Sequence, residues 1–484
     1  MQQLSAGVAR ITITPPVGVR LVGYAIREGL SDGIQEDLHA TAVVLTDGTT
    51  KVAVIACDLT FLWSPYVDGV RERIAREIGV HKRDIVINCS HTHSAPMFPG
   101  FQQQEPEQEE LQRRYYDNLR ELLAGVVSWA NAKLRPVRVG MSRGKSYIGI
   151  NRREVMDGKV VLGENPSGPM DPDVSVIRID EVDGRPLAVL YSYGCHTVTM
   201  GPRSLKISPD FVGPASRVIE QGTGATALFL QGTAGDVNPI CGIGADEDNS
   251  ENMYRMGNSL GGEALKTAMD IRTHNRRGPR WFFGSLAKAS TWTYVPVEGS
   301  GLEHFQVRSK TIELPLQELP SLKEAEEILR QKQDIYQKAQ ASGARESAIV
   351  IAERYYRWAT ILYESVRSGI TRPTRAAEIH GIRINDIGLV SVPGEPLTEL
   401  GLEVKKNSPL PNTIFLGYSN GCLCYLPPAS AYPPSGWSVR EAYHVPDMLF
   451  QGYLLPTALD PCCAQMIVDT SLEVLREMSE GRRG

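Results

Sequence analysis

The sequence predicts an α/β fold with a large mixed β-sheet core, flanked by helices and carrying an inserted helical hairpin. Two observations predict this class. Short apolar strands recur along the chain and alternate with amphipathic helices, and polar loops follow several of the strands. No internal repeat or low-complexity linker divides the 484 residues, which favours a single catalytic domain over residues 1–484.

The first elements illustrate the pattern. Asp47-Gly48 is a strong turn signal, and it joins two apolar strands over 38–45 and 51–57 into a hairpin. Ser64 and Pro65 make an N-cap and first-turn pair for the helix that follows. Further strands are expected over 84–89, 174–179, 187–193, 225–230, 378–383, 387–392 and 413–417, and further helices over 107–133, from 208, over 397–406 and over 463–478.

The pattern changes between 319 and 370, where strands give way to two successive helices. Ser321 and Glu324 form a capping box that opens the first helix, Gly343 breaks it, and a second helix runs to Gly369. We interpret this helical hairpin as an insertion that serves packing or oligomerisation rather than catalysis. A homo-oligomer is compatible with it.

Composition describes an ordinary globular protein, with 42% hydrophobic and 22% charged residues. The net charge of -5 gives no electrostatic reason to expect nucleic acid or an anionic membrane as a partner. The N-terminus has no basic region followed by an apolar one, and no uncharged run reaches transmembrane length, so a cytoplasmic location is expected. The eight cysteines are scattered without a C-x-x-C zinc motif, which predicts reduced and mostly buried thiols.

Two histidines one residue apart follow the apolar strand at 84–89. Alternate side chains of an extended segment point the same way, so His91 and His93 are expected to share one cavity. One imidazole would bind a cation there while the other handles protons. Because H-x-H pairs are also common in polar loops, the pair alone leaves both interpretations open.

Several other polar residues lie just beyond apolar strands, where open α/β sheets gather their ligands. Two histidines and a glutamate supply the usual three protein ligands of a hydrolytic zinc site. Each residue also has a structural interpretation, such as a turn for Glu395, a cap for Asp236 or a cavity rim for Tyr425. The full set is Asp58, His91, His93, His196, Asp236, Glu395 and Tyr425.

With these motifs in view, the chain resembles the neutral/alkaline non-lysosomal ceramidase family, which comprises zinc-dependent amidases that cleave the N-acyl bond of ceramide. The resemblance covers nearly the whole chain, and SHTHSAP at 90–96 is its strongest single piece. The other matching segments are AGVARITIT at 6–14, GYA at 23–25, INR at 150–152, the strand end at His196, GDVNP at 235–239, PGE at 393–395 and the segment 420–425.

The resemblance implies a zinc ion and a group of residues around the scissile carbonyl. The implied mechanism is attack by zinc-activated water, with side chains that stabilise the oxyanion and an acid that protonates the leaving amine. The implied Zn²⁺ ligands are His91, His196, Glu395 and Tyr425, and the implied catalytic residues are His93, Arg152 and Tyr443, the last as the family's second active-site tyrosine.

Two departures from the family pattern bear on the substrate. Asn238 stands where ceramide-cleaving members have an active-site serine, and an amide cannot serve as a hydroxyl nucleophile, although it can hydrogen-bond to substrate. We also expect no C-terminal immunoglobulin-like domain of the kind that ceramidases carry. Both departures argue against ceramide itself and for a more polar small-molecule N-acyl substrate.

The leading hypothesis is therefore a cytoplasmic, zinc-dependent, ceramidase-like amidase that cleaves a linear N-acyl bond and acts in lipid metabolism. One alternative keeps the metal but changes the bond to an ester, lactone or glycoside, because metal-activated water is not specific for amides. Another is a non-catalytic protein that binds an N-acyl ligand, with Asn238 marking the loss of turnover.

Overall fold

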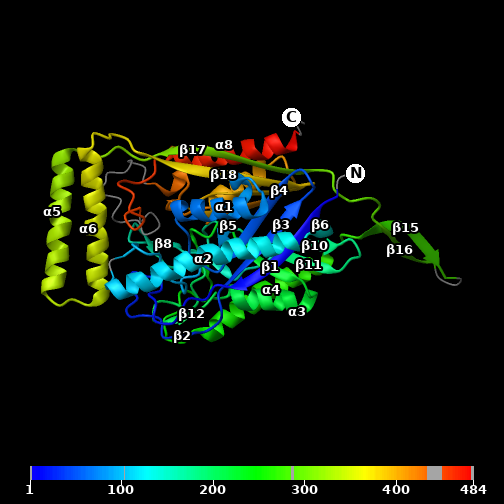
Figure 1. The fold of residues 1–484 in the computed structure, drawn as a ribbon, viewed down its shortest axis with the longest axis horizontal. Helices are drawn as coiled ribbons and strands as arrows, with labels where there is room; N and C mark the ends of the chain where they lie inside the picture. Colours follow the sequence, from blue (N-terminus) through cyan, green and yellow to red (C-terminus); the bar gives the residue numbers. More distant parts are fainter. Residues whose placement is uncertain (1–2, 103, 285–287, 433–449, 481–484) are drawn as a thin grey trace.

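Two mixed β-sheets packed face to face form the centre of the fold (Figure 1). The computed structural model describes residues 3–102, 104–284, 288–432 and 450–480. In order of pairing, the larger sheet consists of β13 (Thr226–Gln231), β11 (Pro186–Tyr193), β10 (Asp173–Glu181), β6 (Arg135–Lys145), β1 (Ser5–Thr12), β3 (His39–Thr46), β4 (Lys51–Cys57) and β5 (Ile85–Cys89). The smaller consists of β17 (Phe305–Pro315), β18 (Thr374–Ile384), β19 (Ile387–Ser391) and β21 (Asn412–Leu416).

Both sheets combine parallel and antiparallel pairs. The pairs β4–β5, β11–β13 and β19–β21 are parallel, whereas hairpins such as β3–β4 and β10–β11 are antiparallel. The predicted α/β class and mixed sheet core are confirmed, and the structure adds that the strands divide into two sheets. Sequence periodicity reveals which strands are buried but not which sheet each one joins.

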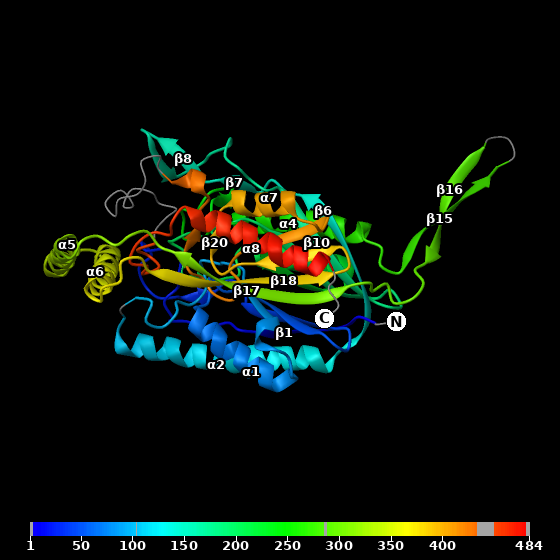
Figure 2. The ribbon, with the colours of Figure 1, turned by 90° about the horizontal axis from the view of Figure 1, so that it is seen from above.

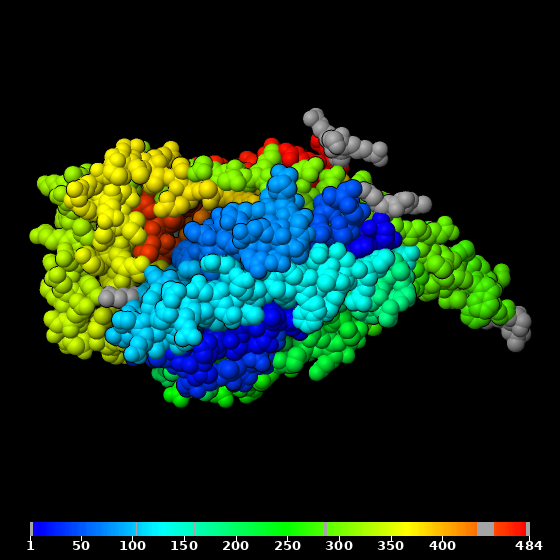
Figure 3. Space-filling view, in the orientation of Figure 1, coloured from blue at the N-terminus to red at the C-terminus, as the bar shows by residue number. Residues whose placement is uncertain are grey.

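Alternating side chains explain the layers. In β1, Ala6 and Val8 face the smaller sheet, where they join a cluster that includes Leu389 and Ile414, whereas Ala9 faces the helical layer outside. Helices cover the outer face of each sheet, and Figure 3 shows α2 in cyan crossing one side of the molecule. Those on the larger sheet are α1 (Ser64–Ile78), α2 (Pro106–Ala132), α3 (Val212–Thr223) and α4 (Ser250–Asp270), and those on the smaller are α7 (Thr398–Asn407) and α8 (Cys462–Ser479).

Two hairpins extend from opposite ends of this body (Figures 1 and 2). One is helical, with α5 (Leu322–Ala341) and α6 (Glu346–Arg367), and the capping box of Ser321 with Glu324 is present. The other pairs β15 (Asn275–Phe283) with β16 (Ala289–Pro296). The short strands are β2 (Gly33–Ile34), β7 (Gly149–Asn151), β8 (Arg153–Met156), β9 (Lys159–Leu162), β12 (Lys206–Ile207), β14 (Val237–Pro239), β20 (Glu395–Pro396) and β22 (Tyr425–Leu426).

Some expectations about local structure were wrong. Trp63 rather than Ser64 occupies the N-cap of α1, and no side chain caps that helix. The strands β6, β15 and β17 were not predicted, since arginines, glycines or exposed faces interrupt their apolar alternation. All eight cysteines are free thiols and most are buried, as expected. Among the described residues, no helix combines the length and the apolar character needed to cross a bilayer.

Candidate metal centre

Three imidazoles and one carboxylate meet where several strands of the two sheets end. His91 Nε2 lies 3.1 Å from His196 Nε2 and 3.2 Å from His93 Nε2. The carboxylate of Glu395 places Oε2 3.2 Å from His91 Nε2 and 3.4 Å from His196 Nε2. The ligand atoms of the three histidines lie within 4.8 Å of one another, and this group can hold a metal ion.

Loops from distant parts of the chain bring these side chains together. His91 and His93 follow β5, which pairs in parallel with β4. His196 follows β11, which pairs in parallel with β13. Glu395 begins β20, directly after β19 of the smaller sheet, and pairs in parallel register with Tyr425 of β22. The site therefore lies at the strand ends of both sheets, where open α/β sheets bind ligands.

Buried amide side chains hold these strand ends in place. Asn88 of β5 donates through Nδ2 to the carbonyl of Gly417 at 2.8 Å and accepts through Oδ1 from the backbone N–H of Gln231 at 2.8 Å. Gln231 of β13 in turn donates through Nε2 to the carbonyls of Ser90 and Cys195, each at 2.9 Å. Two amides thus tie the strand ends that carry His91 and His196 to each other and to the loop after β21.

Three non-glycine residues near the site adopt left-handed backbone conformations, which are uncommon outside glycine. These are His91, with φ of 65°, Tyr418, with φ of 49°, and Asn420, with φ of 56°. The Asn420 side chain accepts from the backbone N–H of Ile87 at 2.9 Å and donates to the carbonyl of Ile85 at 3.1 Å. Such strain persists only where surrounding contacts over-determine it, which is common at functional sites.

Backbone carbonyls orient two of the imidazoles. His91 Nδ1 contacts the carbonyl of Thr60 at 2.9 Å, and His196 Nδ1 contacts that of Ala234 at 2.5 Å. Because an Nδ1–H donated to a carbonyl leaves Nε2 unprotonated in the neutral ring, both Nε2 lone pairs face the cluster. Within the described structure, the buried Nδ1 of His93 has no hydrogen-bond partner.

Burial sets the protonation states. It lowers the pKa of His93 well below its usual range and that of His196 to about 3, so both rings are neutral. Burial would raise the pKa of Glu395, but the adjacent His91 and His196 hold it well below its ordinary value. Neutral imidazoles beside an ionised carboxylate are the forms that bind a divalent cation.

Three tyrosines border the carboxylate. Tyr418 donates to Glu395 Oε2 at 3.3 Å, and Tyr453 donates to Glu395 Oε1. The hydroxyl of Tyr425 accepts from Arg152 Nη2 at 3.0 Å. The sequence analysis missed both Tyr418 and Tyr453. Tyr418 directly follows a predicted strand, so the expectation that ligands gather at strand ends could have found it, whereas no sequence pattern marks Tyr453. Tyr443 lies outside the described residues.

Arg152 joins the predicted catalytic residues into one buried group. Its Nη1 donates to Asn238 Oδ1 at 3.2 Å, and its Nη2 donates to the carbonyl of Gly235 at 2.7 Å. Antiparallel pairing of β7 with β14 places Asn238 beside this guanidinium. Asp236, by contrast, accepts from the backbone N–H of Thr398 at 2.8 Å at the start of α7, which is the structural role open to it.

Comparison with known proteins identifies the family. A family model described as neutral/alkaline non-lysosomal ceramidase, N-terminal, matches residues 4–269. The chain belongs to the neutral/alkaline non-lysosomal ceramidase family. The matched part includes His91, His93, Arg152, His196 and Asn238, whereas Glu395 and Tyr425 lie beyond it.

Similar sequences and structures carry ceramidase names. Neutral ceramidase A from Dictyostelium discoideum is 24% identical over 260 residues, covering 49% of this chain and 36% of that protein. Neutral ceramidase from Mycobacterium tuberculosis is 23% identical over 259 residues, covering 49% of this chain and 40% of that protein. The matched region of this chain therefore covers less than half the length of these relatives.

Two solved structures share the fold over 99% of this chain. One is titled as a ceramidase complexed with C2, with a TM-score of 0.68, 15% identity and 76% of that chain covered. The other is the crystal structure of neutral ceramidase from Pseudomonas aeruginosa, with a TM-score of 0.66, 16% identity and 75% of that chain covered. The ceramidase fold thus extends past the family model to include both sheets.

In this ceramidase-family chain, an apolar cavity of about 230 Å³ opens onto the cluster. Unexpectedly, α6 of the helical hairpin supplies part of its wall, so the hairpin is more than a packing arm. Trp358 of α6 is fully buried and donates through Nε1 to the carbonyl of Leu455 at 3.0 Å, which anchors the helix. The apolar lining includes Val22, Phe61, Met97, Phe101, Val350, Ile351 and Tyr355, beside His91, His93, Glu395, Tyr425 and Tyr453.

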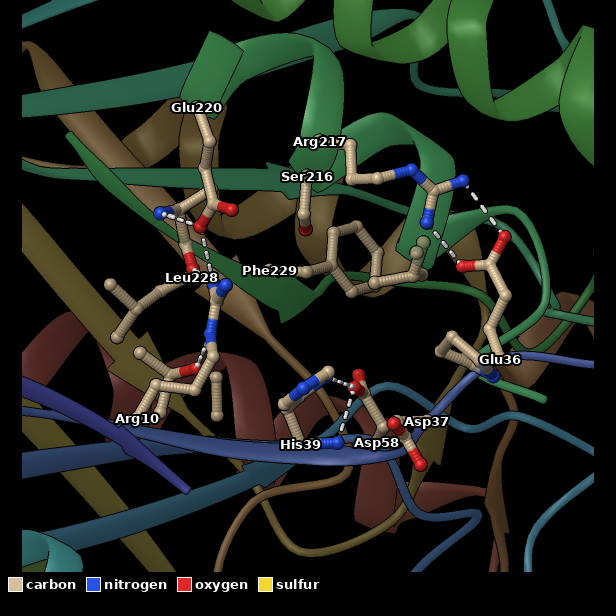
Figure 4. Close-up of a pocket in the computed structure, with 16 residues that line it drawn as sticks. Arg10, Glu36, Asp37, His39, Asp58, Ser216, Arg217, Glu220, Leu228 and Phe229 are labelled. Carbon is tan, nitrogen blue, oxygen red and sulfur yellow. Dashed lines mark hydrogen bonds and ion pairs between the residues drawn. The ribbon is translucent and has the colours of Figure 1, made fainter. Parts of the chain in front are cut away.

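A second cavity, of about 290 Å³, lies between α3 and the larger sheet and contains none of the clustered histidines (Figure 4). Arg10 pairs with Glu220 at 2.6 Å and Arg217 with Glu36 at 2.5 Å, so its arginines are already neutralised. Asp58 faces this cavity and accepts from the backbone N–H of His39 at 2.9 Å. Asp58 is therefore separate from the candidate metal centre, although it too follows a strand.

Gly23 allows His93 its position. At φ of +103°, a Cβ on Gly23 would lie 2.3 Å from His93 Cγ, so Gly23→Ala displaces the ring. We expect metal affinity or turnover to fall about 10–100-fold, the usual cost of disturbing groups around a metal site. Gly18→Ala is the matched control, since Gly18 has φ of +96° and no atom within 4 Å of the added Cβ. Equal losses in both variants would contradict this account.

Asp58 makes stability depend on pH. Burial raises the pKa of Asp58 from 3.8 to about 7, an effect that the N–H of His39 and Arg10 reduce and Glu36 reinforces. The folded state therefore binds this proton more tightly than the unfolded state. The contribution of Asp58 to stability is full below pH ~4 and is lost as pH rises from there through about 7. Relative to wild type, Asp58→Asn should gain about 2–4 kcal/mol of unfolding free energy across this window, measured by urea denaturation. A constant difference at all pH values would refute it.

Proposed function

We propose that this protein is a zinc-dependent amidase that hydrolyses a linear N-acyl bond with metal-activated water. The observation that carries the proposal is the meeting of His91, His196 and Glu395, with ligand atoms within 3.4 Å of one another, beside an apolar cavity that His91 and Glu395 line. Membership in the ceramidase family supports hydrolysis of an amide. The cytoplasmic location and the role in lipid metabolism remain predictions.

The donor set fits zinc. Two imidazoles and one carboxylate are a common protein ligand set for catalytic zinc, and backbone carbonyls orient both rings through Nδ1. Bound there, zinc supplies Lewis acidity that polarises the substrate carbonyl and acidifies the attacking water. Tyr425 completes the proposed ligand set, with Arg152 stabilising its phenolate form through the hydrogen bond to the hydroxyl oxygen.

The remaining side chains have roles that follow from their contacts. His93, which burial keeps neutral, accepts a proton at Nε2 and passes it to the leaving amine. Arg152 is buried and cationic beside the cavity, where it stabilises negative charge on the carbonyl oxygen. Tyr453 and Tyr418 hold the two oxygens of Glu395 in place.

Asn238, at the position of the family's active-site serine, binds substrate rather than acting as a nucleophile. Its Oδ1 accepts from Arg152, which leaves the Nδ2 amide free to donate to the acyl carbonyl or the amine portion of a substrate. A mechanism that needs a serine hydroxyl is closed to this chain, whereas attack by water is not. The same substitution is what favours the alternative of a non-catalytic N-acyl-binding protein.

Cavity size favours a short acyl group. Pockets for drug-sized ligands enclose about 300–1,000 Å³, whereas the described residues here enclose about 230 Å³. The walls from Val350 and Ile351 of α6 and from Phe61 suit a short hydrocarbon chain, with the polar part of the substrate directed to Tyr425, whose hydroxyl accepts from Arg152. We therefore expect a more polar N-acyl substrate than ceramide. Esters, lactones and glycosides are the alternative bonds for the same metal-activated water.

Metal content and turnover, measured together, test the proposal. Purified protein should contain about one zinc per chain by elemental analysis and hydrolyse short N-acyl amines faster than matched esters or glycosides. His196→Ala should lose both metal and activity. His93→Ala should keep the zinc and lose about 10²–10⁴-fold in turnover, the usual range for a general acid–base. His274→Ala, on the exposed surface, is the control.

The outcomes separate the possibilities. Loss of zinc in His93→Ala would make His93 a ligand in place of Glu395 or Tyr425. Metal and ligand binding without turnover, unchanged by Asn238→Ser, would favour the non-catalytic alternative. Wild-type protein that hydrolyses amides without any tightly bound metal would refute the zinc mechanism.

A further inference from the structure

The β15–β16 hairpin projects from the end of the molecule opposite α5 and α6 and pairs with no third strand among the described residues (Figures 1 and 2). A two-stranded hairpin by itself is marginally stable in water. Large aromatic side chains nevertheless lie open to solvent, with Trp281 57% and Phe282 67% exposed, and Phe283, Trp292 and Tyr294 are exposed as well. Exposed apolar groups of this kind mark interaction sites.

Arginines lie over the aromatic rings of this hairpin. Arg272 lies 4.2 Å from the ring centroid of Tyr294, Arg277 lies 5.5 Å from that of Trp292, and Arg280 lies 5.4 Å from the same ring. These cation–π contacts order the side chains but do not neutralise the charges. Within the described structure, none of these arginines forms an ion pair with a carboxylate.

All the charged side chains of the hairpin are basic. The stretch 271–297 contains no aspartate or glutamate, although acidic residues outnumber basic ones over the whole chain, 56 to 51. The net charge of -5 therefore conceals a local cationic surface, and charge complementarity requires an anionic partner. Its basic residues are Arg272, Arg276, Arg277, Arg280 and Lys288.

Strand register shows that both faces of the hairpin are apolar. Trp292 lies directly across from Arg280, which shares its face with Phe282. Trp281 and Phe283 alternate with those residues and stack on each other at 5.0 Å, so they occupy the opposite face. A protein groove or a nucleic acid strand covers one face of a hairpin, whereas the interface of a bilayer surrounds both.

The β8–β9 hairpin is a second exposed apolar projection. The strands β8 and β9 carry exposed apolar residues, Val155, Met156 and Leu162. In Figure 2, the β8–β9 and β15–β16 hairpins rise from the same side of the molecule, the side away from α1 and α2. Apolar projections at two separated points on one side fit a partner that is extended and flat.

We propose that this protein docks on anionic phospholipid bilayers through the β15–β16 hairpin. Trp281, Phe282 and Phe283 enter the headgroup region, where aromatic rings are favoured, and the arginines contact lipid phosphates. A second copy of the chain is a poorer occupant, because two such hairpins would bring five positive charges against five. This docking is peripheral and independent of the catalytic proposal.

Vesicle flotation tests the docking with the full chain. We expect co-flotation with phosphatidylcholine vesicles that contain phosphatidylglycerol, little with phosphatidylcholine alone, and release at high salt. Arg277→Gln with Arg280→Gln should lower the partition coefficient at least about tenfold, since each basic residue near such a surface contributes about fivefold. Trp281→Ser with Phe282→Ser should lower it as well.

Trp129→Ser is the matched control, because Trp129 is 51% exposed and belongs to α2, which lies on the side of the body away from β8 (Figure 2). It should bind vesicles as wild type does, and all variants should keep the circular dichroism spectrum and the thermal unfolding midpoint of wild type, which report an intact fold. Absence of vesicle binding in the wild type, or equal binding by the hairpin variants, would overturn the proposal. A dimer in sedimentation that the hairpin variants abolish, without vesicle binding, would assign the hairpin to a second copy instead.

Discussion

The hydrogen bonds of two buried amides, Asn88 and Gln231, are the constraint on which the site depends. Together they link β5 to β13, which no backbone ladder joins, and they add side-chain bonds to the end of β11 and to the loop after β21. An unsatisfied amide in this position would cost about 1–3 kcal/mol, so the strand ends are held in one arrangement. The loops that carry the three histidines begin at those strand ends.

That arrangement explains the chemistry of the cluster. Loops fixed at their bases can hold His91 in a left-handed conformation and keep its ring in contact with two other imidazoles and with the carboxylate of Glu395, at distances that would be unfavourable for charged rings. Burial removes the charge from His93 and His196, and the carbonyls of Thr60 and Ala234 aim the remaining lone pairs inward. The result is a set of donors that is poorly satisfied without a cation.

Much of this arrangement was within reach of the sequence. His91, His93, His196 and Glu395 each follow an apolar strand, and the rule that ligands gather at strand ends brings them together. The same rule also selected Asp58 and Asp236, which the structure assigns to another cavity and to the start of α7. Strand-end position does not reveal the direction in which a loop turns, and that direction depends on tertiary packing.

Other features had no sequence signal. Tyr453 reaches Glu395 from an irregular loop without periodicity, and the cavity wall from α6 depends on how the helical hairpin docks rather than on its own pattern. The β15 strand was missed because arginines fill the positions where apolar residues were sought, and the same arginines were hidden in the net charge of the chain. A net charge summed over the whole sequence does not reveal a local group of arginines that the fold brings to the surface.

The central claim is that side chains from both sheets share one metal ion. The most direct test is anomalous X-ray diffraction from crystals of the zinc-loaded protein, recorded on both sides of the zinc absorption edge. The account predicts a single anomalous peak about 2.0–2.2 Å from His91 Nε2, His196 Nε2 and a Glu395 carboxylate oxygen. A peak bound only by surface residues, or one that Glu395 does not touch, would contradict it.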